Sequence, residues 1–197
     1  MQAAFSYQPN LKGDSAMFEG FDFTDFWEES AYSTEIYVSE PPTDELIAEI
    51  EQELGYKLPA SYIWLMKQHN GGVLNRDRDG CKIDWSEGYS EWTNNVVKVS
   101  GIMSIGREKT WSVCGTDVQC RPDIGVAIAT TWDGADVIIL DYRECGKDGE
   151  PAVVCVDPNA RLGIWKLADS FESFIRSLGN WDELAAEQEA AKNDHLR

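Results

Sequence analysis

The stretch that decides the fold of this chain is Leu54-Gly55-Tyr56-Lys57-Leu58-Pro59-Ala60-Ser61-Tyr62. Gly55 is a strong helix terminator, because glycine adopts the left-handed conformation that closes a helix without steric cost. Pro59 suits the first position of a new helix, where its missing N–H is not needed. The stretch therefore predicts two short helices that follow one another directly and pack as a hairpin.

Residues on both sides extend these two helices. The first is expected to start after Pro41-Pro42, with Thr43 as its N-cap. Its apolar residues share one face: Leu46, Ile47, Ile50 and Leu54. The second helix is expected to end at Asn70-Gly71-Gly72. It supplies four residues to the core: Tyr62, Ile63, Leu65 and Met66.

Beyond residue 72 the pattern becomes strand-like. Short β-rich runs, separated by Gly, Pro and Asp turns, cover residues 95–99, 124–130, 137–141 and 152–156. Their partial apolar–polar alternation indicates an antiparallel sheet with one covered face. Asp169-Ser170-Phe171-Glu172 then begins a last helix in the manner of a capping box. The predicted fold is α+β: a single domain whose mostly antiparallel sheet is flanked by an N-terminal helical hairpin and a C-terminal helix.

The chain divides into three expected segments. An acidic-aromatic extension covers residues 1–32, a folded domain covers 33–180, and an Ala/Glu-rich tail covers 181–197. The extension interleaves acids with five aromatic residues: Phe18, Phe21, Phe23, Phe26 and Trp27. Disordered tails are poor in such residues, so we expect the extension to dock, either on its own domain, the commoner outcome, or on a partner. The tail is expected to form a helix with a frayed end.

The composition is that of an ordinary globular protein, with 43% hydrophobic residues among 197. A chain of this length buries roughly 70% of its unfolded surface, so its core needs no metal or disulfide. No apolar run approaches the ~20 residues that span a bilayer, and the first residues lack the pattern of a secretory signal. The five cysteines are irregularly spaced, which favours reduced thiols. A soluble, cytoplasmic protein is therefore expected.

Charge is the unusual feature of the composition. The chain has 35 acidic and 17 basic residues, which give a formal net charge of −18. Residues 13–56 contain thirteen of the acids and neither Lys nor Arg. Such a field disfavours nucleic acid and anionic membranes, and it accelerates encounter with a basic partner. The alternative is that this acidic stretch is only a solvated face that keeps the protein soluble.

No residue pattern supports catalysis or cofactor binding. His69 ends the second predicted helix, where a capping or solvent role is expected, and the other histidine, His195, lies in the tail. No Ser or Cys lies in a recognisable nucleophile motif. Cys114 and Cys120 are six residues apart, unlike the closely paired ligands of a structural zinc site. We therefore assign no catalytic residue, no metal ligand and no cofactor, and expect a protein that is not an enzyme.

Two acid pairs, Asp133/Asp136 and Glu87/Glu91, have the composition of the carboxylates that flank a glycosidic bond in glycosidases. Pairs of this kind arise by chance in a chain with 35 acids. Asp133-Gly134 is moreover a typical turn dipeptide, so a solvated turn is the favoured interpretation.

Tryptophans point to an interface. Trp85 and Trp92 bracket a loop that is too polar to bury both indoles, and exposed Trp and Tyr side chains often anchor protein–protein contacts. The candidate partner-binding residues are all acidic or aromatic: Glu28, Glu29, Trp85, Glu87, Tyr89, Glu91, Trp92, Asp133 and Asp136.

The fold-deciding stretch, followed by Leu65, Met66 and His69-Asn70-Gly71-Gly72, carries a family pattern. It resembles the L-G-x-x-L-P-x-x-Y helix-turn-helix, ending in N-G-G, of the SUKH superfamily, the family of the fungal cell-wall-assembly regulator Knr. The resemblance continues at residues 140–143, 149–154, 156–157 and 167–175, so it covers about residues 35–180. It implies an α+β fold with a mostly antiparallel, curved sheet.

The resemblance also implies a kind of function. Bacterial members are typically immunity proteins that bind and neutralise polymorphic toxins, often nucleases, and fungal members are regulatory hubs in cell-wall signalling. Because the acidic stretch could imitate nucleic-acid phosphates, the leading hypothesis is a non-catalytic immunity protein that binds a basic toxin domain. The alternatives are a regulatory protein-interaction scaffold and a hydrolase acting on sugars or nucleotides, for which no base, nucleophile or metal can be assigned. Direct binding of nucleic acid or of a membrane is not expected.

Overall fold

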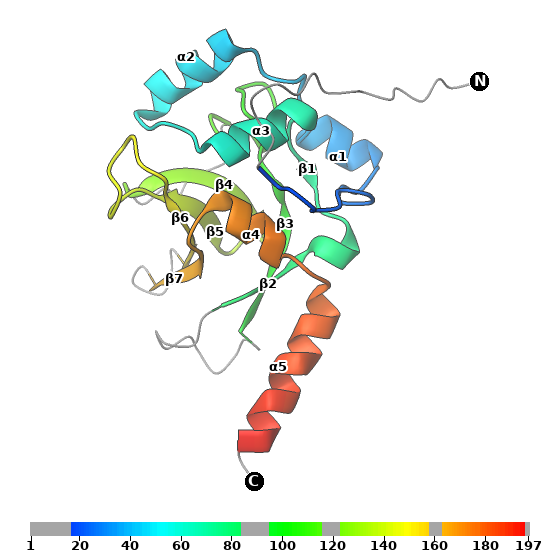
Figure 1. Ribbon diagram of the computed structural model, residues 1–197. Coiled ribbons are helices and arrows are strands. Elements are labelled where there is room, and N and C mark those ends of the chain that lie inside the picture. The colour runs from blue at the N-terminus through cyan, green and yellow to red at the C-terminus, as the bar shows by residue number, and fades with distance from the viewer. Residues whose placement is uncertain (1–16, 84–94, 116–122, 158–162, 196–197) are drawn as a thin grey trace, which may run out of the picture.

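One curved antiparallel sheet of seven strands organises the computed structural model, which describes residues 17–83, 95–115, 123–157 and 163–195 (Figure 1). The strands are β1 (Gly72–Val73), β2 (Gly80–Lys82), β3 (Val96–Ile102), β4 (Gly125–Thr131), β5 (Val137–Asp141), β6 (Ala152–Asp157) and β7 (Gly163–Ala168). The helices are α1 (Ala31–Ile36), α2 (Asp44–Leu54), α3 (Ala60–Gln68), the 3-10 helix η1 (Arg76–Arg78), α4 (Phe171–Ser177) and α5 (Trp181–His195). All the strands join one sheet, and helices precede and follow them along the chain. The chain is therefore a single α+β domain, as predicted.

The strand order within the described residues is β1-β3-β4-β5-β6-β7, and β2 pairs with β3 next to β1. The predicted strand runs correspond to β3, β4, β5 and β6. Two or three residues are too few to give a periodic signal, which is why β1 and β2 escape sequence-based prediction. β7 is only half-buried and pairs with β6 alone, so its apolar pattern is weak.

The centre of the sheet is covered on both faces. All five positions of β5 are buried, although neighbouring side chains on a strand point to opposite faces. The predicted single covered face is therefore wrong for this strand. Its sequence, a continuous apolar run from Val137 to Leu140, is typical of burial on both sides.

The two consecutive helices of the predicted hairpin are confirmed, but α2 and α3 make few close contacts, so the expected packing of one on the other is not found. The Oγ1 atom of Thr43 accepts a 3.2 Å hydrogen bond from the backbone N–H of Leu46, so Thr43 caps α2 as expected. Gly55 closes α2 in the left-handed conformation, with φ of 76°. Pro59 stands at the N-cap of α3, one residue earlier than predicted.

Residues of the fold-deciding motif bind α3 to the segment that follows β3. The hydroxyl of Tyr62 donates to the Met103 carbonyl. The Asn70 side chain accepts from the Ile105 N–H at 2.8 Å and donates to the carbonyls of Glu40 and Ile105. These polar groups are buried and satisfied, which fixes one arrangement of helix and sheet.

The described part of the N-terminal extension packs on its own domain. Phe18 and Phe26 are buried, and the Phe18 ring lies 5.3 Å from the Trp64 ring of α3. The Phe18 N–H donates a 3.0 Å hydrogen bond to Glu172 of α4. α1 has only six residues and no periodic apolar face, which is why the sequence did not predict it.

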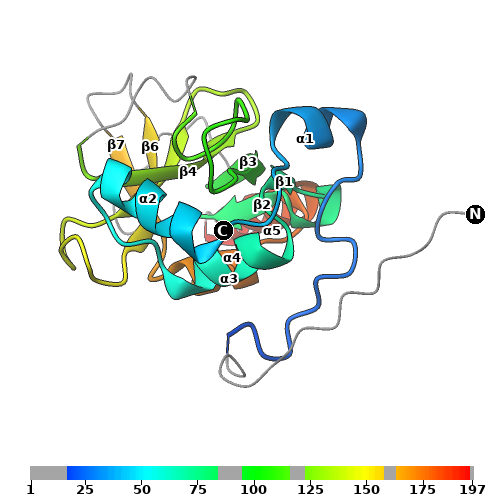
Figure 2. The same ribbon diagram turned by 90° about the horizontal axis from the view of Figure 1, so that it is seen from above.

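The arrangement of the helices around the sheet is visible from above (Figure 2). α3 and α4 lie together on one side of the sheet, and α1 lies near β1, at the end of the sheet far from β7. α4 begins with the predicted cap, because Ser170 and Ser173 each accept a hydrogen bond from the other's backbone N–H. α5 extends away from the domain toward the C-terminus (Figure 1).

Candidate interaction surface

Two large apolar side chains are exposed among the described residues, Tyr32 at 57% and Trp132 at 67%. Both line one hollow of about 260 Å³, together with Glu28, Val73 and Ser100. We call it the first hollow. Exposed aromatic side chains beside polar groups are typical anchors of protein–protein contacts.

Main-chain hydrogen bonds hold the walls of the first hollow to the sheet. The Glu28 N–H donates to the Val73 carbonyl at 2.9 Å, and the Val73 N–H donates to Ser33 Oγ of α1 at 3.0 Å. The Trp132 N–H donates to the Lys98 carbonyl of β3, also at 2.9 Å. Segments that are distant in sequence are thereby fixed around the same space.

The β4–β5 turn carries Trp132. Asp133 Oδ1 accepts hydrogen bonds from the Thr131 hydroxyl at 2.7 Å and from the Ala135 N–H at 3.1 Å, and Gly134 has a φ of 69°. These bonds hold the pKa of the Asp133 carboxyl below its ordinary value. The predicted turn at Asp133-Gly134 is therefore confirmed, and Asp133 is exposed.

Trp132 also lines a second hollow, of about 370 Å³. Its lining residues are Ile83, Val96, Val97, Lys98, Thr131, Trp132, Asp133, Asp136 and Trp181. The Lys98 Nζ atom lies 5.2 Å from the ring centroid of Trp132 and 5.3 Å from that of Trp181. A cation therefore already contacts both indole rings, as the ring quadrupole favours.

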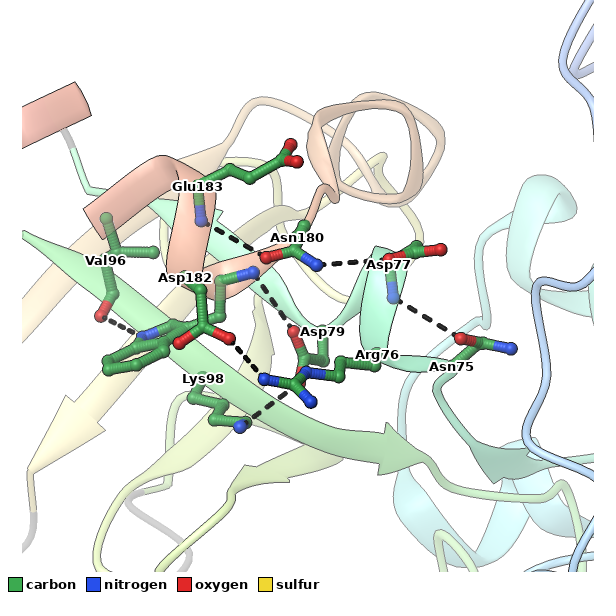
Figure 3. Close-up of polar contacts among 10 residues, drawn as sticks. Asn75, Arg76, Asp77, Asp79, Val96, Lys98, Asn180, Asp182 and Glu183 are labelled. Carbon is green, nitrogen blue, oxygen red and sulfur yellow. Dashed lines mark hydrogen bonds and ion pairs between the residues drawn. The ribbon is translucent and has the colours of Figure 1, made fainter. Parts of the chain in front are cut away.

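Asp79 fixes both Lys98 and Trp181. Its Oδ2 atom lies 3.4 Å from Lys98 Nζ, and its Oδ1 atom accepts a 3.2 Å hydrogen bond from the Trp181 N–H (Figure 3). The Trp181 indole N–H in turn donates to the Val96 carbonyl at 3.4 Å.

Further polar contacts hold the start of α5 against η1. Arg76 and Asp182 form a 2.7 Å ion pair, and Asn180 donates to Asp77 at 3.1 Å (Figure 3). α5 is therefore anchored at its first turn, which places Trp181 beside the sheet.

Two carboxylates, those of Asp133 and Asp136, line the second hollow. Burial, followed by the negative charges of Asp157 and Asp133, raises the pKa of Asp136 to about 6. The Asp136 carboxylate is thus less stable in its charged form than an isolated aspartate, and a cation brought close to it would favour ionisation.

A third hollow of about 520 Å³ adjoins the first through Glu28. Glu29 and His69 also line it. His69 is the C-cap residue of α3, and its imidazole stacks on Trp27 with ring centroids 4.9 Å apart. Burial lowers the pKa of His69, so the ring is largely neutral near pH 7.

The three hollows form one continuous strip, because Trp132 lines the first and second and Glu28 lines the first and third. We call this strip the aromatic-acidic band. It comprises Glu28, Glu29, Tyr32, Lys98, Trp132, Asp133, Asp136 and Trp181. The band brings together Glu28, Glu29, Asp133 and Asp136, the four candidate binding residues that the structure describes. The other five, Trp85, Glu87, Tyr89, Glu91 and Trp92, lie outside the described residues.

Four residues of the band were not predicted from the sequence: Tyr32, Lys98, Trp132 and Trp181. Trp132 had a local signal, because a tryptophan next to a two-residue polar turn has little chance of full burial. No local sequence signal marked Tyr32, since only the fold brings Tyr32 of α1 next to Trp132 of the β4–β5 turn.

The acidic stretch divides into two parts. Acids of α2 form ion pairs: Asp44 with Lys67, Glu51 with Lys57, and Glu49 and Glu53 with Arg107. By contrast, Glu28 and Glu29 are exposed and form no ion pair with any described residue. Within the acidic stretch, four acids of α2 are therefore paired with basic residues, whereas the charges of Glu28 and Glu29 are not.

Three other findings bear on function. Across the described ranges, no three His, Cys, Asp or Glu side chains come together in a way that could hold a metal ion. Cys81, Cys145 and Cys155 are free thiols. None of the helices in the described part of the chain joins the length and the apolar character that crossing a bilayer requires.

The chain is a single-domain α+β protein. Its distinguishing features are two consecutive helices that end at Asn70-Gly71-Gly72, a curved antiparallel sheet and the capped α4. The chain belongs to the SMI1 / KNR4 family (SUKH-1), whose family model matches residues 41–177. No curated protein matches the chain by sequence. Membership in this family is consistent with a protein-interaction or immunity-type role.

The boundaries of the family match cross the aromatic-acidic band. Lys98 and the turn with Trp132, Asp133 and Asp136 lie inside the matched residues. Glu28, Glu29 and Tyr32 precede them, and Trp181 follows them. The band is thus built where family-matched residues meet the segments on either side.

Proposed function

We propose that this chain is a non-catalytic immunity protein that binds and neutralises a cognate toxin domain of basic character. The observation that carries the proposal is the exposure of Tyr32 and Trp132 beside Glu28, an acid that forms no ion pair with any described residue. The protein-interaction or immunity-type role with which family membership is consistent supports the same conclusion.

The two kinds of residue in the band would contribute differently to binding. Acids such as Glu28, Glu29 and Asp133 attract a basic surface and accelerate its approach. Aromatic rings supply buried area and slow dissociation once the complex has formed. The same negative charge disfavours direct binding of nucleic acid or of an anionic membrane.

The direct test is co-expression with each toxin-like protein that is found to be encoded beside this chain. Wild-type protein is expected to restore growth and to co-purify with the toxin. The double variant Tyr32→Ala/Trp132→Ala is expected to lose most protection, because each exposed anchor contributes about 2 kcal/mol. The matched control is Glu144→Gln/Asp148→Asn, which changes two exposed acids outside the band. If the wild-type protein neither binds nor neutralises any neighbouring toxin, the proposal fails.

A second candidate is a regulatory interaction scaffold. Three adjoining hollows on one strip offer room for more than one partner segment, which favours this alternative. Affinity capture at low and high salt separates the two functions. One tightly held partner supports immunity, whereas several weakly held partners support the scaffold.

A further inference from the structure

We infer that the first hollow receives one arginine side chain of the partner protein. The inference rests on the proposed function, because it assigns a chemistry to the residue that the partner inserts into the band. It concerns the space between Tyr32 and Trp132, with Glu28 as the charged group.

Size and lining make this hollow unlike a metabolite site. Its volume of about 260 Å³ lies below the roughly 300 Å³ at which small-molecule sites begin, and it suits a single long side chain. Two aromatic residues, one carboxylate, one serine and one valine line it, and none of the described lining residues is basic. The hollow is therefore complementary to one cationic side chain.

Arginine matches this lining better than lysine. A guanidinium group is planar, stacks on aromatic faces and presents paired N–H donors to a carboxylate, whereas an ammonium group is a strongly hydrated point charge. Tyr32 and Trp132 supply the rings, and Glu28 supplies the carboxylate. Glu28 is exposed and has no ion pair among the described residues, so its charge is available to a partner.

The hollow is formed before binding. Main-chain bonds of 2.9 Å attach Glu28 to Val73 and Trp132 to Lys98, and Ser33 Oγ attaches α1 to Val73. Little ordering of the walls would be required when the side chain enters, which favours affinity.

Lys98 does not fill the hollow. Its ammonium group approaches the Trp132 ring at 5.2 Å, but it lines the second hollow and is paired with Asp79. Lys98 thus places one cation near the Trp132 indole, and the first hollow stays open to a second cation from a partner.

Short peptides test the inference on the full chain. With protein labelled with ¹⁵N on its indoles, the Trp132 signal is identified as the one lost in Trp132→Phe. Acetyl-Gly-Arg-Gly-amide at millimolar concentration is expected to shift this signal. The matched peptide with citrulline, which has the same shape and no charge, is expected to leave it unchanged. A lysine peptide is expected to bind about threefold more weakly than the arginine peptide.

Variants identify the groups responsible. Glu28→Gln and Tyr32→Leu are each expected to weaken the arginine response about threefold or more, whereas Glu144→Gln leaves it unchanged. Thermal unfolding verifies that each variant is folded. Equal responses to arginine and citrulline, or an arginine response that Glu28→Gln does not reduce, would overturn the inference.

The toxin assay distinguishes this inference from the proposed function. If Glu28→Gln and Tyr32→Leu neutralise the toxin as well as wild type, the arginine site is wrong and the immunity function stands. If the arginine peptide binds as expected but no neighbouring toxin is bound, the site stands and the immunity function fails.

Discussion

The hydroxyl of Tyr62 donates a 2.6 Å hydrogen bond to the backbone carbonyl of Met103, and both residues are fully buried. The bond joins α3 to the segment after β3, at the core of the family motif. Burial raises the pKa of Tyr62 well above its ordinary value, which keeps the hydroxyl protonated as a donor.

The variant Tyr62→Phe is expected to lower the free energy of unfolding by about 1–2 kcal/mol, because the buried Met103 carbonyl loses its donor. Urea unfolding at neutral pH measures the change. Tyr56→Phe is the control, at a half-buried tyrosine between α2 and α3, and it is expected to lower the free energy of unfolding less. Equal effects of the two substitutions would show that the Tyr62 hydroxyl is not important for stability.

Gly71 is expected to tolerate no side chain. Its φ is 84°, and an added Cβ would lie 2.8 Å from both the Ser104 nitrogen and the Tyr37 oxygen. Gly71→Ala should therefore lower stability by about 3 kcal/mol or more through strain and backbone clash together. Gly134→Ala isolates the strain, because φ there is 69° but an added Cβ meets nothing within 4 Å. Thermal or urea unfolding should give a loss of only about 1 kcal/mol for Gly134→Ala.

Asp136 is expected to make stability fall as pH rises. Its pKa is about 6 in the folded protein against an ordinary value of 3.8, so the folded state holds this proton more tightly than the unfolded state does. The stabilising contribution is complete below pH 3.8 and is lost as pH rises through 6.

Asp136→Asn is accordingly expected to stabilise the protein at pH 7. Because the carboxyl group is partly exposed, solvent screening limits the gain to about 1 kcal/mol. The gain should shrink toward zero near pH 4, and Asp148→Asn, at an exposed acid with no such neighbours, should show no comparable trend. Urea unfolding across this pH range provides the measurement. A gain independent of pH would contradict the assignment.

Association with a basic partner is expected to depend on salt through Glu28 and Glu29. Raising the ionic strength to 0.15 M shortens the Debye length to about 8 Å and should slow association. Glu28→Gln/Glu29→Gln should lower the on-rate at low salt and flatten its salt dependence, as stopped-flow mixing with the captured partner would show. Glu144→Gln/Asp148→Asn should leave both nearly unchanged. Point substitutions are preferable to deletion of residues 1–32, because Phe26 in that segment is buried in the core.

Much of the fold could be predicted from local chemistry. Gly55 ends α2 and Ser170 caps α4, and both do so through bonds to residues at most four positions away. Signals of that range are fully present in the sequence. β1 and α1 are different, since each is too short to show periodicity and is stabilised mainly by its neighbours in the fold.

The candidate site was predicted only in part for the same reason. Glu28 and Asp133 stand out in the sequence as acids, but their proximity depends on the bonds that attach residue 28 to β1 and residue 132 to β3. Tyr32 becomes notable only when Trp132 is opposite it. Exposure of an aromatic residue is a tertiary property, which no periodicity of the sequence records.

The family match ends between the residues that build the band, with Tyr32 before it, Trp132 within it and Trp181 after it. Part of the surface that would recognise a partner therefore lies outside the residues that the family model matches. Exchanging only the exposed residues of the segments outside the match, such as Glu28 and Tyr32, between two such proteins would graft a new recognition edge onto an unchanged core, in which Phe26 remains buried. Partner choice could then be re-engineered in modules, with the buried motif left as it is.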